Sequence, residues 1–381
     1  MTMTRRRFLA AGSAATLLTL WSSHGMAKAM GTGPQDRRLL VVMLRGALDG
    51  LHAVVPQGDA DYARLRGALA PQQVLTLDNG FALHPALAFS RELYAQGQWA
   101  PLLAVAPPYR QRSHFEAQDC VENGTLKPGG ANTGWLNRCV ASMHGVEALS
   151  VGAVTPLIAR GPGEVMAWSP PLPDGVNPVL AHQLQALYAA DATLAAPFAR
   201  ALAEQGMAPE RTDGAQLVQA MQAAADFMGR ADGPRVGFVE DSGWDTHANQ
   251  AQVLQRKLAE LDAGLRAFHD HAGGAWRDTA VVVVTEFGRT AAVNGTGGTD
   301  HGTGGVAFLA GGAVRGGRLL GDWPGLSPSA LNEGRDLRAT TDMRALFKGL
   351  LRDHLGVSEA ALETRVFPDS RGIKPLEKLT A

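Results

Sequence analysis

The clearest hydrophobic pattern in the chain is a continuous β-branched run, residues 281–284, which follows a long amphipathic segment. In residues 248–271, leucine or phenylalanine recurs every three or four positions, which gives one apolar stripe and predicts a helix. The valine run shows no polar alternation, and such a run suits a strand covered on both faces, as in a parallel sheet. With a further strand expected at residues 235–240, the order is strand, loop, helix, strand, which is typical of a doubly wound α/β sheet.

Other apolar runs extend this pattern to both sides. Strands are expected at residues 37–44, 99–106, 149–154 and 304–311, and helices at 59–69, 83–96, 134–144, 180–228 (with a break near 206–214) and 343–355. The last 25 residues are expected to form a surface tail. No internal repeat is visible, so we expect one α/β domain over residues 30–381, with a helical elaboration at about 161–233.

The N-terminus has the features of an export signal. Arg5, Arg6 and Arg7 precede a 14-residue apolar stretch, and Ala27-Lys28-Ala29 supplies a small-x-small cleavage site. The paired arginines before Phe8-Leu9 resemble a twin-arginine signal, which is an address read by a receptor. The apolar stretch is short of the roughly 20 residues that span a bilayer. We therefore expect residues 1–29 to be a signal peptide, and the mature protein to be periplasmic or secreted without a stable membrane span.

Composition narrows the function classes. The 381 residues are 45% hydrophobic and 19% charged, as in ordinary globular proteins, and the net charge of −1 gives no indication of a nucleic-acid surface. Two cysteines, Cys120 and Cys139, are too few for a disulfide-rich scaffold. In an oxidising compartment a single disulfide and two buried free thiols are both compatible with the sequence.

Carboxylates and imidazoles follow the predicted strands, at the sheet edge where ligands bind in open α/β folds. These residues are Asp49, Asp245, His247, Glu286, Asp300 and His301, and Arg289 lies among them. Such side chains suit zinc, manganese, magnesium or calcium, so we predict a divalent metal site without assigning the ion. Asp300 and His301 are adjacent, so one of them is expected to contact the ion and the other to support it. Asp49 is equally compatible with a helix N-cap, and Arg289 with a clamp for a phosphate or sulfate group.

Ser113 and His114 begin a predicted helix and offer a second chemistry. Ser113 with Glu116 fits a capping box, and a serine at a helix N-terminus also fits a nucleophile that attacks an anionic substrate. His114 is compatible with a base, a metal ligand or a substrate contact. No G-x-S-x-G turn follows a strand, which disfavours a serine hydrolase of the α/β-hydrolase type.

The motifs LRGALDGL, RSHFEAQD, GWDTHANQ, TEFGRT and GTDHGTGG, together with the twin-arginine leader, resemble the bacterial domain-of-unknown-function 1501 family. This family is similar to the alkaline phosphatase and sulfatase superfamily. The resemblance implies a three-layer αβα sandwich with a mostly parallel central sheet. It also implies hydrolysis of phosphate or sulfate esters with one or two divalent metals.

Carried onto this sequence, the resemblance implies that Asp49, the Asp245–His247 pair and His301 are metal ligands, and that Ser113 stands near the nucleophile position. Phe287 occupies a position where the superfamily has a histidine ligand, which removes one expected ligand. Two hypotheses follow. The first is an exported metal-dependent hydrolase of small or polymeric anionic esters, with the twin-arginine translocase as its export partner. The second is a non-catalytic periplasmic binding or structural protein on the same fold.

Overall fold

The computed structural model describes residues 36–143, 145–152, 154–169 and 216–381. Residues Arg37–Ala381 form one compact unit. The predicted signal peptide lies outside the described residues, and so does most of the predicted helical elaboration at 161–233. None of the described helices combines the length and the apolar character needed to cross a membrane.

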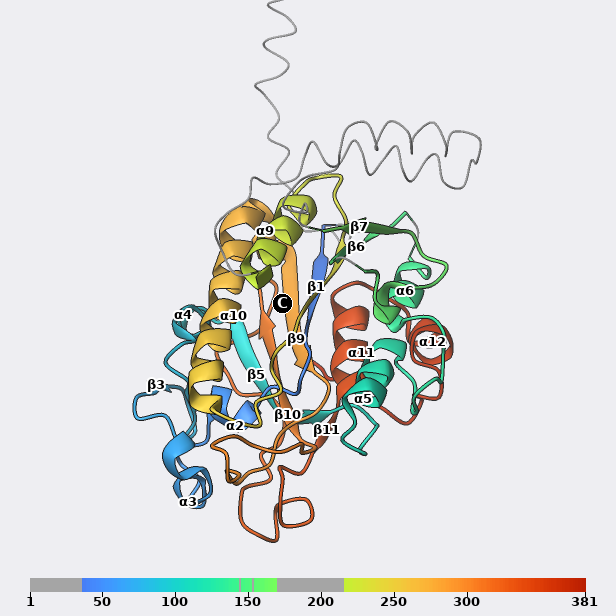
Figure 1. The fold of residues 1–381 in the computed structure, drawn as a ribbon. Helices are drawn as coiled ribbons and strands as arrows, with labels where there is room; N and C mark the ends of the chain where they lie inside the picture. The colour runs from blue at the N-terminus through green and yellow to red at the C-terminus, as the bar shows by residue number, and fades with distance from the viewer. Residues whose placement is uncertain (1–35, 144, 153, 170–215) are drawn as a thin grey trace, which may run out of the picture. The chain divides into compact units, whose positions relative to one another are not determined.

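An eight-stranded sheet runs through this unit in the order β11-β5-β10-β9-β1-β8-β6-β7 (Figure 1). The strands are β1 (Arg38–Leu44), β5 (Trp99–Ala106), β6 (Ala148–Val151), β7 (Val165–Trp168), β8 (Val236–Asp241), β9 (Thr279–Thr285), β10 (Gly305–Ala310) and β11 (Thr341–Asp342). Neighbouring strands are parallel, except that β10 is antiparallel to both β9 and β5. A small second sheet contains β2 (Val54–Val55), β3 (Leu75–Thr76) and β4 (Ala82–Leu83).

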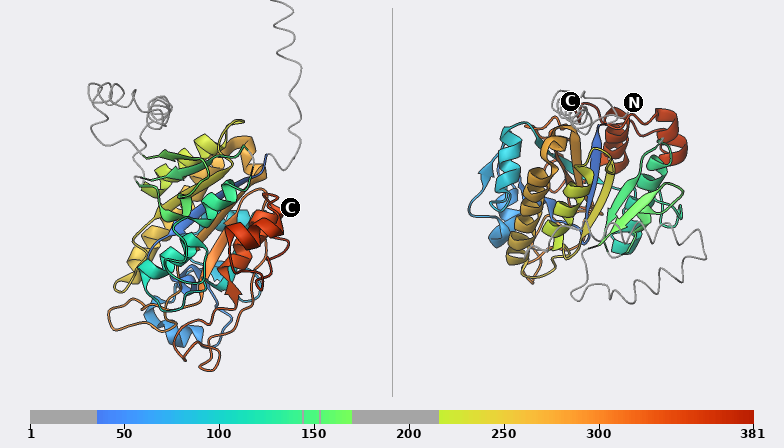
Figure 2. Two further views of the ribbon diagram at one scale, coloured as in Figure 1. Left: turned by 90° about the vertical axis from the view of Figure 1, so that its right-hand side faces the viewer. Right: turned by 90° about the horizontal axis from the view of Figure 1, so that it is seen from above.

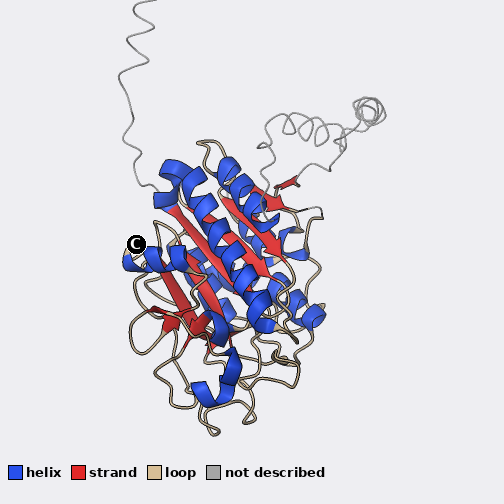
Figure 3. Ribbon diagram, turned by 60° about the vertical axis from the view of Figure 1, so that its left-hand side comes forward, coloured by secondary structure: helices blue, strands red, loops and turns tan. Residues whose placement is uncertain are grey.

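Helices cover both faces of the sheet (Figures 2 and 3). The helices are α2 (Gly50–Ala53), α3 (Tyr62–Arg66), α4 (Ala88–Ala95), α5 (His114–Asn123), α6 (Trp135–Val140), α9 (Gln216–Met228), α10 (Gln250–Ala272), α11 (Met343–Asp353) and α12 (Glu359–Ala361), with short turns η1 (Gly67–Leu69), η2 (Leu157–Ala159), η3 (Gly273–Asp278) and η4 (Leu362–Val366). Helices α4, α9 and α10 share one hydrophobic core with the sheet, and α6 and α11 share the other.

The valine run shows how one strand serves both cores. Val281 and Val283 of β9 pack into the α9–α10 core, whereas Val282 and Val284 pack into the α6–α11 core. Successive side chains of a strand point to opposite faces, so a strand between two helical layers must be apolar at every position. The three-layer αβα architecture with a mostly parallel sheet is therefore confirmed.

Several local predictions were wrong. The helix expected at residues 83–96 begins at Ala88, and the preceding Ala82–Leu83 segment pairs as β4. The last 25 residues are not a surface tail, because Leu362, Val366 and Phe367 are buried in the α11 core. For Cys120 and Cys139 the sequence left a disulfide and two buried free thiols open, and the structure has the buried free thiols.

His354, at the end of α11, leads to a prediction about acid stability. Its side chain is buried, its Nε2 lies 2.8 Å from the carbonyl oxygen of Arg38, and burial lowers its pKa to about 4. As pH falls below 6.5, an unfolded chain protonates this imidazole while the folded chain does not, so the free energy of unfolding decreases. The contribution of one such histidine amounts to about 3 kcal/mol by pH 4, since each pKa unit corresponds to about 1.4 kcal/mol.

We expect His354→Gln, which can still donate to the Arg38 carbonyl, to flatten the loss of stability between pH 6.5 and pH 4. Urea unfolding at several pH values, followed by circular dichroism, measures this slope. Equal slopes for the variant and the wild type would contradict the assignment.

Candidate metal centre

Four side chains from three separate parts of the chain meet at the carboxyl ends of the parallel strands. Asp245 and His247 follow β8, and His301 lies in the loop between β9 and β10. His114 is the first residue of α5. His114, Asp245 and His301 each offer one ligand atom, and these three atoms all lie within 4.8 Å of one another.

The distances among these atoms suit coordination of one cation. The Nε2 atom of His301 lies 3.0 Å from Nε2 of His114 and 3.0 Å from Nε2 of His247. Asp245 Oδ1 lies 3.1 Å from His247 Nε2 and 3.4 Å from His301 Nε2, and Asp245 Oδ2 lies 3.3 Å from His114 Nε2. Around a tetrahedral zinc ion with metal–nitrogen bonds of about 2.0–2.1 Å, ligand atoms are about 3.3 Å apart. The observed separations are close to this value.

The opposite nitrogen of each imidazole is held by an acceptor. His114 Nδ1 lies 2.7 Å from Glu286 Oε1, His247 Nδ1 lies 3.2 Å from Asp300 Oδ1, and His301 Nδ1 lies 3.0 Å from the carbonyl oxygen of Arg112. When Nδ1–H donates in this way, a neutral ring presents the bare lone pair of Nε2. Three lone pairs and a carboxylate then face one another, and two bare nitrogens cannot hydrogen-bond. A cation among His114, Asp245 and His301 satisfies these three groups, and His247 adjoins them through His301 and Asp245.

The charge states of the cluster agree with ligation. Burial lowers the pKa of His301, so this ring is neutral as a ligand must be. Burial raises the pKa of Asp245, but the charge of Arg289 more than offsets this and the pKa is lowered overall. Burial likewise lowers the pKa of His114, but the hydrogen bond and charge of Glu286 outweigh it and the pKa is raised. His114 is therefore the imidazole best placed to hold a proton when no cation is bound.

Glu286 lies behind His114 as a buried anchor. Besides His114, its Oε1 accepts hydrogen bonds from Gly46 N and Gln118 Nε2, both at 2.8 Å, and its Oε2 accepts from Thr285 Oγ1 at 3.0 Å. Burial alone would raise the pKa of Glu286, but these donors lower it overall, so it is a carboxylate. The sequence predicts Glu286 as a direct ligand, whereas in the structure its carboxylate contacts Nδ1 of His114 and is not part of the group formed by His114, Asp245 and His301. Asp300 stands in the same relation to His247, since its Oδ1 lies 3.2 Å from Nδ1 of that ring.

Glu286→Gln is expected to weaken divalent-metal binding about 10- to 100-fold, because a carboxylate that accepts from the far nitrogen of a coordinating imidazole sets the tautomer and basicity of that ring. Metal competition against a fluorescent chelator measures the affinity. Glu116→Gln is a matched control, since Glu116 lies on the same helix but bonds the Tyr109 hydroxyl instead. Equal affinities for both variants would contradict the positioning role of Glu286.

Asp49 is not brought into this cluster. Its carboxylate forms a buried ion pair with Arg66, accepts from Gln250 Nε2 at 2.6 Å, and caps α2 through Leu51 N. Burial raises its pKa, but the charge of Arg66 reverses the shift and the pKa is lowered. Donors thus engage both carboxylate oxygens of Asp49. The contact from Leu51 N is the helix N-cap that the sequence offered as the alternative role for Asp49. These contacts give no support to metal ligation by Asp49.

Ser113 was expected to cap α5 or to act as a nucleophile, and Arg289 to clamp an anionic group. Ser113 occupies the N-cap position of α5, but its side chain makes no capping hydrogen bond, and Glu116 bonds Tyr109. The predicted capping box is therefore wrong. Arg289 is buried and its Nη1 lies 2.8 Å from Asp245 Oδ1, so it neutralises a cluster carboxylate. Its Nε and Nη2 atoms have no hydrogen-bond partner among the described residues.

Sequence reasoning missed two residues that shape the site, Gln118 and Arg112, and one that pairs with Asp49 outside it, Arg66. Gln118 follows His114 by four positions on α5, a spacing that places both on one helix face and was a usable signal. Arg112 holds a left-handed backbone, with φ of 61°, while its carbonyl accepts from His301. Arg66 reaches Asp49 from α3. Nothing in the local sequence indicates either of the last two arrangements.

The model of one protein family, described as protein of unknown function (DUF1501), matches residues 177–366. This region belongs to the DUF1501 family. The resemblance predicted from the motifs is confirmed. The DUF1501 region contains the cluster residues Asp245, His247 and His301, whereas His114 lies before it.

No curated protein matches the chain. Among solved structures, Ps i-CgsB in complex with k-i-k-neocarrahexaose is similar at 8% identity, with 72% of this chain and 66% of that chain covered and a TM-score of 0.36. A protein in the alkaline phosphatase superfamily from Vibrio parahaemolyticus shares 12% identity over 75% of this chain and 62% of that chain, with a TM-score of 0.36. A mutant TAB5 alkaline phosphatase with bound Mg, from an Antarctic bacterium, shares 11% identity over 75% of this chain and 94% of that chain, with a TM-score of 0.37. The chain thus spans slightly less than two thirds of the first of these structures.

Proposed function

We propose that this DUF1501 protein is an exported, metal-dependent hydrolase of phosphate or sulfate esters. The observation that supports the proposal is the convergence of His114, His247 and His301 through Nε2 on the Asp245 carboxylate, with every Nδ1 tied to an acceptor. Such a donor set of nitrogen and oxygen atoms suits a borderline divalent ion such as zinc.

The proposed chemistry divides between the ion and the chain. A divalent cation, when bound, polarises an ester oxygen and stabilises the oxygen that departs. His114, Asp245 and His301 would hold it, with His247 beside them, and Arg289 keeps Asp245 ionised at the site. Ser113 is the candidate nucleophile, because it directly precedes a ligand and its hydroxyl is not used as a helix cap. His114 can hold a proton on Nδ1 against Glu286.

The exposure of the cluster defines the side from which a substrate approaches. The side chains of Asp245, His247 and Asp300 are 40%, 45% and 54% exposed, whereas Glu286 and Arg289 are buried behind them. The Phe287 ring lies 4.8 Å from the ring of His114 and closes the same inner side against water. An ester would therefore reach the cation from the solvent side formed by the β8 and β9–β10 loops.

The test is metal analysis of the purified mature protein, followed by turnover assays with p-nitrophenyl phosphate and p-nitrophenyl sulfate. Apo protein reconstituted with zinc, manganese, magnesium or calcium should show metal-stimulated hydrolysis of at least one ester. Absence of both bound metal and stimulated turnover would remove the proposal. Stoichiometric metal without turnover across both ester classes would favour the alternative, a non-catalytic periplasmic binding protein.

Export is part of the proposal and is supported by the twin-arginine pattern of residues 1–29. Replacing Arg5 and Arg6 together by lysine keeps the charge but alters the pair that the translocase reads. The double variant should accumulate uncleaved in the cytoplasm, whereas the parent appears shortened in the periplasmic fraction. Equal export of both would contradict a twin-arginine route.

A further inference from the structure

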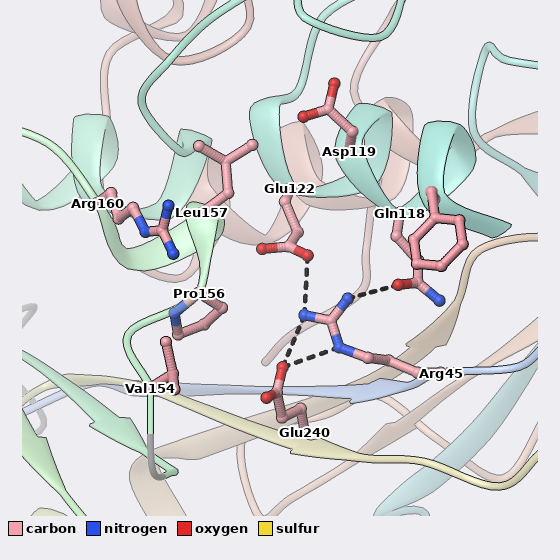
Figure 4. Close-up of a pocket in the computed structure, with 10 residues that line it drawn as sticks. Arg45, Gln118, Asp119, Glu122, Val154, Pro156, Leu157, Arg160 and Glu240 are labelled. Atoms are coloured by element: carbon pink, nitrogen blue, oxygen red, sulfur yellow. Dashed lines mark hydrogen bonds and ion pairs between the residues drawn. The ribbon is translucent and has the colours of Figure 1, made fainter.

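A cleft of about 370 Å³ lies beside the candidate metal centre, between α5, the segment before η2 and the end of β8 (Figure 4). Its size is within the range of about 300–1,000 Å³ that is usual for small-molecule sites. Phe115, Gln118 and Asp119 of α5 line one wall, and Val154 and Arg160 line the other. The cleft is not used by the proposed metal chemistry itself.

Gln118 lies between the cleft and the candidate metal centre. Its side chain lines the cleft, and its Nε2 donates to Glu286 Oε1, the same oxygen that holds His114 Nδ1. Phe115 directly follows His114 in the first turn of α5. A molecule in the cleft would therefore lie against the same helix that carries the candidate ligand His114.

The charges that line the cleft disfavour binding of an anionic group there, in addition to the ester group proposed at the metal centre. Arg45 donates to Gln118, Glu122 and Glu240 at 2.8, 2.8 and 2.6 Å, so its charge is already paired (Figure 4). Counting Arg45 and Arg160 against Asp119, Glu122 and Glu240, the lining carries two positive and three negative charges, a formal sum of −1. An additional phosphate or sulfate would meet net repulsion here.

The cleft offers both unused hydrogen-bond donors and an unused acceptor. Arg160 uses Nε to donate to the carbonyl oxygen of Thr155, and its terminal nitrogens have no partner within the described ranges. Glu240 bonds Arg45 through Oε2 alone, which leaves Oε1 as an acceptor at a side chain 32% exposed. Donors and acceptors side by side suit hydroxyl groups, since each hydroxyl both donates and accepts.

An exposed aromatic ring adds an apolar platform. Phe115 is 87% exposed and Val154 is 69% exposed, and both are at the cleft. An aromatic side chain exposed to water forgoes the free energy that burial of its apolar surface would supply. Exposed apolar groups at a concave site therefore commonly mark contact with a ligand. The C–H face of a sugar ring is apolar and flat enough to pack on such a ring, while its hydroxyls face outward.

We propose that this cleft binds a neutral sugar ring, so that the ester substrate is a phosphorylated or sulfated carbohydrate. The ester part of this statement rests on the proposed function, whereas the binding of the sugar ring does not. Phe115 packs against the ring, Arg160 donates to its hydroxyls, and Glu240 accepts from them. The ester group then points toward the metal candidate on the other side of Gln118.

The experiment measures binding of neutral oligosaccharides to the metal-free mature protein by ligand-observed NMR. The probes are the hexaoses of maltose, cellulose, chitin and xylan type, which carry no ester. At least one should bind, and Phe115→Ala and Arg160→Ala should each weaken that binding at least tenfold. Leu126→Ala and Arg256→Ala are matched controls, because both residues are exposed and do not line the cleft.

Each outcome decides the proposal. Failure of all probes to bind would overturn it, and so would binding that is unchanged in both cleft variants. Since no metal and no ester take part, a protein that lacks hydrolase activity can still bind a sugar, and an active hydrolase can fail to do so. The sugar site and the proposed function therefore fail in distinguishable ways.

Discussion

Alanine in place of His301 is expected to weaken metal binding strongly and to reduce metal-stimulated ester hydrolysis with it. The Nε2 atom of His301 is the centre of the cluster, within 3.4 Å of a ligand atom of His114, His247 and Asp245. Its loss removes one nitrogen ligand and separates the other two imidazoles. We expect the metal affinity to fall by at least about 100-fold, more than for a supporting residue, whose loss typically costs 10- to 100-fold.

Calorimetric titration with zinc and manganese measures the affinity, and the p-nitrophenyl assays measure turnover. His269→Ala is a suitable control, because His269 is a partly exposed histidine near the C-terminal end of α10 and is not part of the cluster. Circular dichroism should show that both variants retain the αβα fold. A His301→Ala protein that binds metal as tightly as the His269→Ala protein would contradict the assignment of this cluster.

Asp49→Asn is expected to destabilise the fold by about 3–5 kcal/mol while leaving metal stoichiometry unchanged in the folded fraction. The Arg66 guanidinium that Asp49 neutralises is fully buried, and removing one partner of a buried pair leaves an uncompensated charge at a cost of about that size. Urea unfolding measures the stability and metal analysis measures the stoichiometry. The two readouts separate an ion-pair role from a ligand role for Asp49.

A double variant, Asp49→Leu with Arg66→Met, tests whether the lost stability comes from the unpaired charge of Arg66. Removing both charges together should restore much of the stability lost in the single variant, since apolar replacements of buried pairs are often neutral. If Asp49→Asn instead keeps its stability and loses metal, Asp49 is a ligand and the mature site is larger than the cluster described above.

The hydrophobic pattern was sufficient for the layers of the fold. The centre of β9 is apolar at every position because helices cover both faces, and that requirement is visible in the sequence as an unbroken valine run at residues 281–284. The stripe on α10 is equally local. The antiparallel direction of β10 was not predictable in this way, because strand direction depends on which neighbour the segment meets rather than on its own side chains.

The site was predictable only as a neighbourhood. Asp245, His247 and His301 follow predicted strands, so their placement at one sheet edge came from topology alone. Glu286 and Asp300 belong to the same loops, but their side chains reach ring nitrogens rather than the centre of the cluster. Residue type cannot separate a ligand from the group that orients it, since carboxylates serve as both.

The sequence by itself determined the alternation of strands and helices and the strand-end position of most candidate ligands, because these depend on local periodicity. Its N-terminal pattern predicts the export address. Tertiary structure decided which groups face one another: α5 brings His114 to His301, and Arg66 of α3 pairs with Asp49. The left-handed backbone of Arg112 aims a carbonyl at His301. Such directions are set by loop conformation and long-range packing, which a linear pattern does not encode.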